Sequence, residues 1–283
     1  MSNPNQKFNT VISPTWCPGC GNYGIWQALK QALFELELEP HQVYISYDIG
    51  CCGNGANFTK TYGFHSLHGR ALPVAVGAKL GNHDLKVLAF IGDGGGYGEG
   101  VQHLVHSARY NLDITYIVAN NQRFSLTTGQ SSPTTDLKTI TSTTPFGEIK
   151  KPLNPLALSL VSGTTFLARG FSGDIQHLTS LIKQAILHKG FAHIDILQPC
   201  VTFNKQNTYE WFREVTYKLE DHKYKPNNKQ NAIEKVFEFE LEGKMPVGLI
   251  YQENKKSYTE QIPQLDKKPL YQQSLEGINC LSD

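Results

Sequence analysis

The chain has 283 residues, and 40% of them are hydrophobic, enough for the core of one large domain or two smaller ones. Lys and Arg (26) nearly balance Asp and Glu (25), so the net charge of +1 gives no electrostatic argument for nucleic-acid binding. No apolar run approaches the ~18 residues of a membrane span, and no signal-peptide pattern opens the sequence. We therefore expect a soluble, cytoplasmic protein without membrane contact, whose six cysteines are metal ligands or free thiols rather than disulfides.

The hydrophobic pattern predicts alternating helices and strands. In chain order we expect a helix over 22–38 with Asn22 as its N-cap, a strand over 41–50, a helix over 67–81, a strand over 85–92, a helix around 99–110 and a strand over 113–121. After a long polar loop over 122–153, we expect a strand over 164–170, an amphipathic helix over 172–190 and a strand over 191–200. This alternation predicts an α/β fold with a doubly wound, mostly parallel sheet.

The composition changes after about residue 204. Lys-rich stretches there alternate with aromatic residues such as Trp211 and with the apolar run "MPVGLIY" at 245–251. We therefore expect a main ligand-binding domain over 1–204 and a C-terminal arm over 205–283. Because apolar residues are interspersed in the arm, we expect it to pack on its own domain or on a partner subunit.

The predicted strand over 85–92 runs directly into the glycine-rich stretch "GDGGGYGEG" at 92–100. Glycines let the backbone approach a ligand closely, and the next helix would offer its first amides to a phosphate. Asp93 follows this strand and Asn121 follows the next, so both would lie at the ligand-binding edge of a parallel sheet. Their oxygen ligands suit Mg²⁺, which also binds diphosphate. The spacing indicates a thiamine diphosphate site, whereas a Rossmann site would need G-x-G-x-x-G and an acid after the next strand.

Five cysteines lie in stretches that could form a metal site. Cys17 and Cys20 form C-x-x-C, Cys51 and Cys52 follow the strand over 41–50, and Cys200 ends the strand over 191–200. The second C-x-x-C of a zinc ribbon, expected about 15–20 residues further on, is absent from the sequence. A four-thiolate site at the sheet edge could still hold zinc or an iron–sulfur cluster. We favour the cluster, because decarboxylation on thiamine yields a strong reductant whose electrons a cluster would accept.

These stretches together resemble the β subunits of the 2-oxoacid:ferredoxin oxidoreductases, and most closely those of the 2-oxoglutarate or broad 2-oxoacid type. The matching stretches span about residues 15–204, with "MPVGLIY" as a weaker match. They are "TWCPGCGNYG", "DIGCCG", "HSLHGRALPVAVGAKL", "GDG", H-x-x-R-Y-N at 106–111, "ANNQRFSLTTGQSSPTT" and "QPCVTFN".

The resemblance implies three cofactors: thiamine diphosphate, Mg²⁺ and a [4Fe–4S] cluster, all carried by the domain over 1–204. The implied cluster ligands are Cys17, Cys20, Cys51 and Cys200, and the implied Mg²⁺ ligands are Asp93, Asn121 and the backbone carbonyl of Arg123. The implied thiamine-lining residues are Ile49, Gly50, Cys51, Cys52 and His68, with Gly92, Gly94 and Gly95 at the diphosphate. His68 is also the implied catalytic residue of this chain.

Thiamine activation requires a carboxylate close to the aminopyrimidine ring. Neither Glu99 nor Glu148 has a convincing sequence context for this role, and in the family the glutamate comes from the α chain. The resemblance therefore implies an active site shared with an α subunit. There a 2-oxoacid, with 2-oxoglutarate favoured, would be oxidatively decarboxylated to acyl-CoA and CO₂, with electrons passing to ferredoxin. The alternatives are a pyruvate-preferring enzyme, a non-catalytic zinc-stabilised scaffold subunit and a non-redox thiamine decarboxylase.

The sequence also departs from the family pattern around the diphosphate site. The family commonly has GDGD, whereas this chain has Gly95 in place of the second Asp and adds Glu99. Arg123 and Ser125 stand where hydrophobic and glycine residues are common. The implied Mg²⁺ ligands are unaffected by these changes, so the departures concern the substrate and the surroundings of the cofactor.

Overall fold

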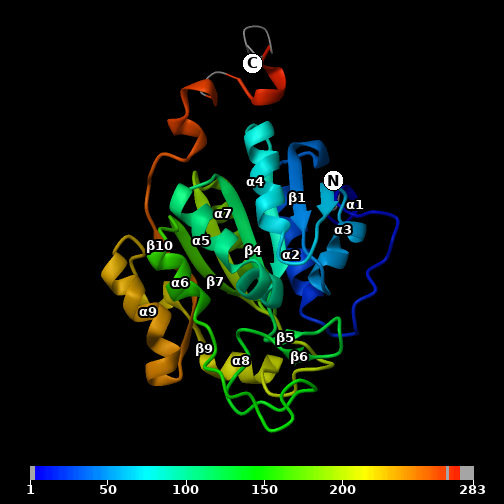
Figure 1. Ribbon diagram of the computed structural model, residues 1–283, viewed down its shortest axis with the longest axis vertical. Helices are drawn as coiled ribbons and strands as arrows, with labels where there is room; N and C mark the ends of the chain where they lie inside the picture. The colour runs from blue at the N-terminus through cyan, green and yellow to red at the C-terminus, as the bar shows by residue number, and fades with distance from the viewer. Residues whose placement is uncertain (1–3, 266–267, 275–283) are drawn as a thin grey trace, which may run out of the picture.

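One eight-stranded sheet organises the molecule in the computed structural model, which describes residues 4–265 and 268–274 (Figure 1). The strand order is β2-β1-β3-β4-β8-β7-β10-β9. The strands of the sheet are β1 (Val43–Tyr47), β2 (Tyr62–His65), β3 (Lys86–Gly92), β4 (Ile114–Asn120), β7 (Phe166–Phe171), β8 (Phe191–Leu197), β9 (Thr216–Lys218) and β10 (Met245–Gln252). In this spatial order, each strand from β2 through β1, β3, β4 and β8 to β7 pairs in parallel with its neighbour. Strand β10 runs antiparallel to β7. The predicted α/β fold with a mostly parallel sheet is confirmed.

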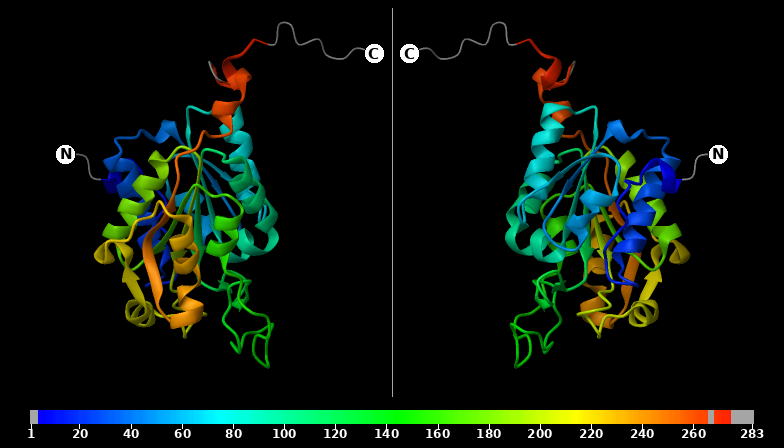
Figure 2. Two further views of the ribbon diagram at one scale, coloured as in Figure 1. Left: turned by 90° about the vertical axis from the view of Figure 1, so that its left-hand side faces the viewer. Right: turned by 90° about the vertical axis from the view of Figure 1, so that its right-hand side faces the viewer.

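Helices cover both faces of the sheet, as a doubly wound fold requires (Figure 2). The helices are α1 (Pro4–Lys7), α2 (Asn22–Glu35), α3 (Gly55–Phe58), α4 (Ala71–Gly81), α5 (Val101–Tyr110), α6 (Pro155–Val161), α7 (Ile175–Leu187), α8 (Tyr209–Val215) and α9 (Lys229–Glu242). The apolar stripes of α2 and α7 pack together against one face of the central strands. The small residues of α4 and the apolar side of α5 pack on the other face. No helix in the described residues is long and apolar enough to cross a bilayer.

The central strands are buried on both sides, which explains their continuous apolar sequence. All seven residues of β4 are buried, and the five residues from Val87 to Ile91 of β3 are buried as well. A parallel strand covered by helices on both faces reads as an unbroken apolar run rather than an alternating one. The predicted strands over 85–92 and 113–121 are therefore confirmed to within two residues.

Three predicted helices begin or end differently in the structure, and the one predicted over 172–190 is the shorter α7, with Asp174 as its N-cap. The first ends at Glu35 rather than at 38, because Glu37 adopts a left-handed φ of 55°. Its predicted N-cap is wrong: Gly21 is the N-cap, and neither polar atom of the buried Asn22 side chain has a hydrogen-bond partner in the described residues. The helix predicted over 67–81 begins at Ala71, because Gly69 turns the chain with a φ of 69°.

The polar loop over 122–153 extends past the carboxyl ends of the central strands (Figure 2). It contains a small antiparallel pair, β5 (Arg123–Phe124) and β6 (Gln130–Ser131), that was not expected from the sequence. Its surface carries several exposed apolar side chains. They are Leu126, Leu137, Ile140, Phe146 and Ile149.

The residues after 204 add β9 and β10 to the same sheet. Leu219, Val236 and Ile250 from this segment form a buried cluster with Leu156 and Leu160 of α6. Strand β10 pairs directly with β7, which places "MPVGLIY" inside the sheet. The division of the chain near residue 204 remains a prediction, and Cys280 lies outside the described residues.

Candidate functional site

The residues that follow four of the parallel strands lie at one edge of the sheet. Asp48 to Cys52 follow β1, Asp93 to Gly95 follow β3, Asn121 follows β4, and Cys200 lies three residues after β8. The carboxyl edge of a parallel sheet is where ligands bind in this class of fold. Two adjoining pockets occupy this edge, and they share Cys51, Asn121, Ser125 and Leu126 in their walls.

The first pocket, which we call the diphosphate pocket, contains all the residues predicted for thiamine and Mg²⁺. Its lining comprises Ile49, Gly50, Cys51, Cys52, His68, Gly92, Asp93, Gly94, Gly95, Ala119, Asn121, Arg123, Phe124, Ser125, Leu126 and Thr127. The structure brings these positions together in one pocket, and their individual roles remain predictions.

Glycine is required at two positions of the diphosphate pocket by close contacts. A Cβ atom on Gly94 would lie 2.3 Å from the Phe124 ring, and one on Gly95 would lie 2.0 Å from Oδ2 of Asp48. No side chain fits at either position without displacing these neighbours. The backbone that follows β3 is thereby exposed to a ligand, and Gly95–Glu99 form a short π-helical turn.

Asp93 is buried and is already held by hydrogen bonds. Its Oδ2 accepts from the hydroxyls of Ser132 (2.6 Å) and Thr134 (2.7 Å), and its Oδ1 accepts a longer bond from the Asn121 backbone N–H (3.4 Å). Burial raises the pKa of Asp93 to about 6, against the lowering effect of these bonds. Among the described residues, no basic side-chain nitrogen lies within 4 Å of the Asp93 carboxylate oxygens to form an ion pair. A buried carboxylate without a cationic partner fits a cation ligand.

Asn121 is fixed in orientation by its neighbours. Its Oδ1 accepts from the backbone N–H of Arg123 (3.0 Å) and from the hydroxyl of Ser125 (3.1 Å), and its Nδ2 donates to Gln198 Oε1 (2.8 Å). The Asn121 backbone N–H and the Asp93 carboxylate thus meet beyond the ends of β3 and β4, and both residues line one pocket; their role as Mg²⁺ ligands remains a prediction. Ser132, Thr134 and Gln198 support this site; they lie in the family-matching stretches "ANNQRFSLTTGQSSPTT" and "QPCVTFN", but no role was expected for them.

The second pocket, which we call the cysteine cavity, brings four thiols together. Cys17, Cys20, Cys51 and Cys200 line a cavity of about 190 Å³. Burial raises the pKa of Cys20 to about 12 and that of Cys51 to about 11, and the neighbouring thiols add to both shifts. Cys52 does not line this cavity; it faces the diphosphate pocket, where burial raises its pKa well above the ordinary value. In the described part of the chain, no three His, Cys, Asp or Glu side chains are close enough to hold a single metal ion.

Aromatic residues hold the loop that carries the first two cysteines. Trp16 packs edge-to-face against Tyr23 and Phe58, and its indole N–H donates to the carbonyl of Cys51 (2.6 Å). The Gln198 amide donates to the Cys20 sulfur at 3.4 Å. The cavity wall is therefore tied to β1 and β8 by contacts that do not involve the thiols of Cys17 or Cys200.

Among the histidines, His68 is the one that lines the diphosphate pocket. Its Nδ1 lies 3.3 Å from Oδ2 of Asp48 and 3.7 Å from Oε2 of Glu99, and its ring meets the Phe124 ring edge-on. The Asp48 carboxylate is the main cause that raises the pKa of His68. The sequence analysis did not single out Asp48, which is completely buried beside the pocket.

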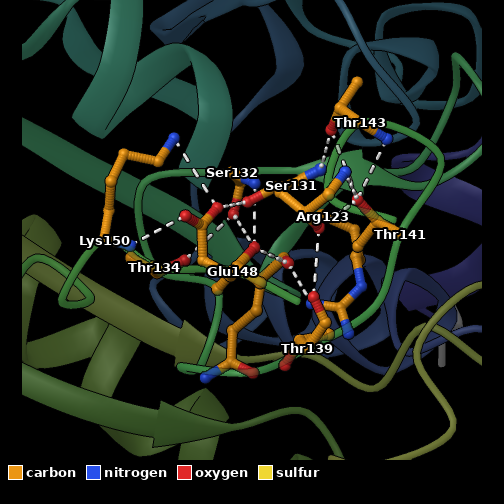
Figure 3. Close-up of polar contacts among 12 residues, drawn as sticks. Arg123, Ser131, Ser132, Thr134, Thr139, Thr141, Thr143, Glu148 and Lys150 are labelled. Atoms are coloured by element: carbon orange, nitrogen blue, oxygen red, sulfur yellow. Dashed lines mark hydrogen bonds and ion pairs between the residues drawn. The ribbon is translucent and has the colours of Figure 1, made fainter. Parts of the chain in front are cut away.

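Glu148 is buried within the long loop, where it organises the backbone (Figure 3). Its carboxylate accepts from the Ser131 hydroxyl and from the Lys150 backbone N–H (2.9 Å), and these bonds lower its pKa. Its own backbone bonds to Lys138 and Thr139. Since Ser131 precedes Ser132, this network fixes the segment whose hydroxyls hold Asp93. Glu148 thus has a structural task in this chain.

Two family models match the chain. The model "Thiamine pyrophosphate enzyme, C-terminal TPP binding domain" matches residues 41–196, and the model for the C-terminal part of the pyruvate ferredoxin oxidoreductase β chain matches residues 200–267. The first covers the strands and loops that form both pockets, apart from the C-x-x-C segment and Cys200.

Relatives and a solved structure agree with the family models. The 2-oxoacid:ferredoxin oxidoreductase subunit beta of Saccharolobus solfataricus is 44% identical over 87% of this chain and 84% of its own length. The 2-oxoacid:ferredoxin oxidoreductase 1, subunit beta, of Aeropyrum pernix is 39% identical over 94% of this chain and 86% of its own. A solved structure of the 2-oxoglutarate:ferredoxin oxidoreductase from Magnetococcus marinus, with 2-oxoglutarate, coenzyme A and succinyl-CoA bound, matches with a TM-score of 0.85 and 34% identity, covering 91% of this chain and 87% of that one. The chain therefore belongs to the family of 2-oxoacid:ferredoxin oxidoreductase β subunits and contains a thiamine diphosphate-binding domain.

Proposed function

We propose that this chain holds thiamine diphosphate, Mg²⁺ and a [4Fe–4S] cluster and acts with an α subunit on a 2-oxoacid, with 2-oxoglutarate favoured. In the balanced reaction, 2-oxoacid, CoA and two oxidised ferredoxins give acyl-CoA, CO₂, a proton and two reduced ferredoxins. The observation that carries the proposal is the position of the cysteine cavity, which adjoins the diphosphate pocket at one sheet edge and shares four residues with it. Electrons released in the diphosphate pocket would therefore have an acceptor, the cluster, in the adjoining cysteine cavity.

The residues present fit the two ionic groups. Asp93, Asn121 and the carbonyl of Arg123 would hold Mg²⁺, which in turn would anchor the diphosphate against the backbone of Gly92, Gly94 and Gly95. Thiamine, when bound, supplies the electron sink that makes decarboxylation of a 2-oxoacid possible. Ile49, Gly50, Cys51, Cys52 and His68 would line its ring system, exclude water and present the His68 imidazole to the reacting groups.

The cysteine cavity fits a cluster better than a single ion. Zinc needs its thiolates drawn together around one atom at ~2.3 Å. The four thiols instead surround a cavity of about 190 Å³, and no three His, Cys, Asp or Glu side chains among the described residues converge on a single-ion site. A polynuclear cluster spans the larger space, with one thiolate at each corner.

An α subunit would complete the site. Glu148 is committed to Ser131 and Lys150, and the half-exposed Glu99 does not line the diphosphate pocket, so we infer that the carboxylate that activates thiamine comes from the partner. The long loop beside the pockets presents Phe146 and Ile149, which are 100% and 89% exposed, together with Ile140. Exposed apolar side chains gathered on one loop are typical of an interaction surface.

The proposal is tested by purifying the chain anaerobically in complex with a cognate α subunit. We expect a brown complex that contains iron and bleaches with dithionite. With CoA and a low-potential acceptor, a 2-oxoacid panel should show a higher kcat/KM for 2-oxoglutarate than for pyruvate. Stoichiometric zinc without iron would support the scaffold alternative instead, and a preference for pyruvate would overturn the substrate assignment.

Replacing a cavity cysteine separates redox from non-redox chemistry. We expect Cys200→Ser to lose most of the iron and at least about 90% of ferredoxin reduction, because the cluster loses one of its four ligands. Cys52→Ser is the matched control, since Cys52 is equally buried but faces the other pocket; it should keep its iron. Undiminished ferredoxin reduction in Cys200→Ser would favour a non-redox decarboxylase.

A further inference from the structure

A completely buried carboxylate, Asp48, lies behind the diphosphate pocket with one cationic neighbour. It directly follows β1, and neither of its oxygens has a hydrogen-bond partner in the described residues. Its ion-pair contact within 4 Å is His68, whose Nδ1 lies 3.3 Å from Oδ2. Burying a carboxylate costs free energy unless a partner compensates it. The contact with His68 therefore offsets part of the free-energy cost of burying the Asp48 carboxylate.

The space that Asp48 occupies is left open by a missing side chain at Gly95, in the π-helical turn that follows β3. A Cβ atom built on Gly95 would lie 2.0 Å from Oδ2 of Asp48 and 3.0 Å from Nδ1 of His68. The Cβ atom of any other residue at position 95 would thus overlap the Asp48 carboxylate and lie close to Nδ1 of His68. Gly95 has no left-handed φ, so its backbone would accept another residue. A side chain at position 95 and the present Asp48 carboxylate therefore cannot occupy this space together.

We propose that Asp48 is a positioning residue that holds the His68 imidazole by Nδ1 and turns Nε2 towards the thiamine pocket, supplying from β1 the carboxylate that the glycine at position 95 does not. The proposal rests on the proposed function of the pocket, and it extends that function to a residue outside the family's GDGD pattern. The proposal explains why this chain can have Gly95 where the family pattern has an Asp: the carboxylate of Asp48 occupies the space next to position 95.

Other groups around His68 are weaker candidates for this role. Glu99 lies 3.7 Å from Nδ1 and its side chain is 45% exposed, so solvent screens its charge. Arg70 donates to the Glu99 carbonyl at 2.9 Å, and the Phe124 ring is apolar. Cys52 and Tyr116 face Asp48 but have pKa values raised well above their ordinary ranges, so they are neutral near pH 7. The pKa of His68 is itself raised, chiefly by Asp48.

The first test measures the imidazole directly in the full chain without cofactors. Histidines are labelled with ¹³C, the His68 signal is assigned by its loss in His68→Gln, and its pKa is read from an NMR pH titration. We expect Asp48→Asn to weaken proton binding at His68 about tenfold, because the carboxylate that stabilises the imidazolium is removed. The matched control Glu99→Gln should change it less than about threefold, because that carboxylate is exposed. A larger effect in Glu99→Gln than in Asp48→Asn would overturn the proposal.

The second test moves the carboxylate from position 48, after β1, to position 95, in the turn after β3. Gly95→Asp alone should lower the melting temperature, because two carboxylates would compete for one space. Asp48→Ala combined with Gly95→Asp should restore both the melting temperature and the His68 titration. The control pair Asp48→Ala with Gly95→Ala fills space without charge, and it should not restore the His68 titration. Equal restoration by both pairs would show that volume, not charge, matters, and would overturn the proposal.

These outcomes are separable from the proposed function. The His68 titration needs no iron, thiamine or partner subunit. If the complex contains no cluster while Asp48→Asn still shifts the titration, the redox assignment fails and the positioning role stands. If iron content and ferredoxin reduction are normal while Asp48→Asn leaves the titration unchanged, the positioning role fails alone.

Discussion

The two pockets at the sheet edge differ in how much of their geometry the chain supplies by itself. In the diphosphate pocket, Asp93 is held by two hydroxyls and a backbone N–H, and Asn121 is fixed at both ends of its amide. In the cysteine cavity, four cysteines line an unfilled space, and burial raises the pKa of Cys20 and Cys51. The first site is preorganised by hydrogen bonds, whereas the second would be completed by what it binds.

This difference has a thermodynamic consequence. Because a cluster binds thiolates, loading the proposed cluster into the cysteine cavity would release protons that the buried thiols hold tightly. The bound cluster would thereby contribute to the stability of the loop that carries Cys17 and Cys20. The diphosphate pocket needs little rearrangement, and binding there loses little conformational entropy. Three predictions sharpen the contrast, and they are ordered by the size of the expected effect.

The largest effect concerns the reactivity of the empty cysteine cavity. At pH 8 in the metal-free chain, we expect Cys20 to react with iodoacetamide about a thousandfold more slowly than an ordinary thiol, because its pKa is about 12 and only the thiolate reacts. The rate should rise about tenfold per pH unit until the pH reaches that pKa. Mass spectrometry of the labelled peptide measures it, with the exposed Cys17 as internal reference. Equal rates at the two positions would mean that the cavity opens freely.

The next effect concerns the anchor of the diphosphate pocket. Asp93→Asn should weaken Mg²⁺-dependent binding of thiamine diphosphate about a hundredfold, since the amide keeps the shape but loses the charge that holds the cation. The melting temperature should not fall, because a buried charge without an ionic partner has been removed. Calorimetry gives both values, and Asp84→Asn, at an exposed position, is the control. Loss of iron from Asp93→Asn would show that the two pockets are not independent.

The smallest effect concerns the hydroxyls that support the anchor. Thr134→Val removes a hydrogen bond that stabilises the charged form of Asp93, so its pKa should rise further above its present value of about 6. Thiamine diphosphate affinity should fall about threefold at neutral pH, and the loss of binding on acidification should begin at a higher pH than in the wild type. Thr139→Val, whose hydroxyl bonds Gln206 instead, should leave the pH profile unchanged. An unaltered profile in Thr134→Val would mean that this hydroxyl does not tune Asp93.

The sequence was sufficient for the parts of the fold that rest on local pattern. The buried strands β3 and β4 and the helix α7 follow from apolar runs and helical spacing, and the shared edge follows from the geometry of parallel strands. Once that edge was identified, Asp93 and Asn121 were expected to be neighbours, and the structure places them so. The relevant signal in each case is a periodicity or a residue at a strand end.

Features that depend on contacts distant in sequence were not predictable in this way. Asn22 satisfies the residue preference of an N-cap, but Gly21 occupies that position and the Asn22 side chain is buried without a partner in the described residues. Asp48 opens the family-matching stretch "DIGCCG", but that stretch does not reveal its contact with His68 or the missing side chain at Gly95. Ser132 and Thr134 lie in a loop whose path is set by Glu148, which no local pattern reveals.

The reversed direction of β10 has a practical consequence for measuring electron transfer. Because β10 runs antiparallel to β7, the chain that follows it emerges at the side of the sheet opposite the two pockets (Figure 1). The short helical segment Leu270–Gln272, drawn in red in Figure 1, lies at that end of the molecule, and its Tyr271 is 63% exposed. A surface linker introduced there would attach the molecule to an electrode with its cysteine cavity facing solution, so that a soluble redox carrier and the electrode would approach from opposite ends.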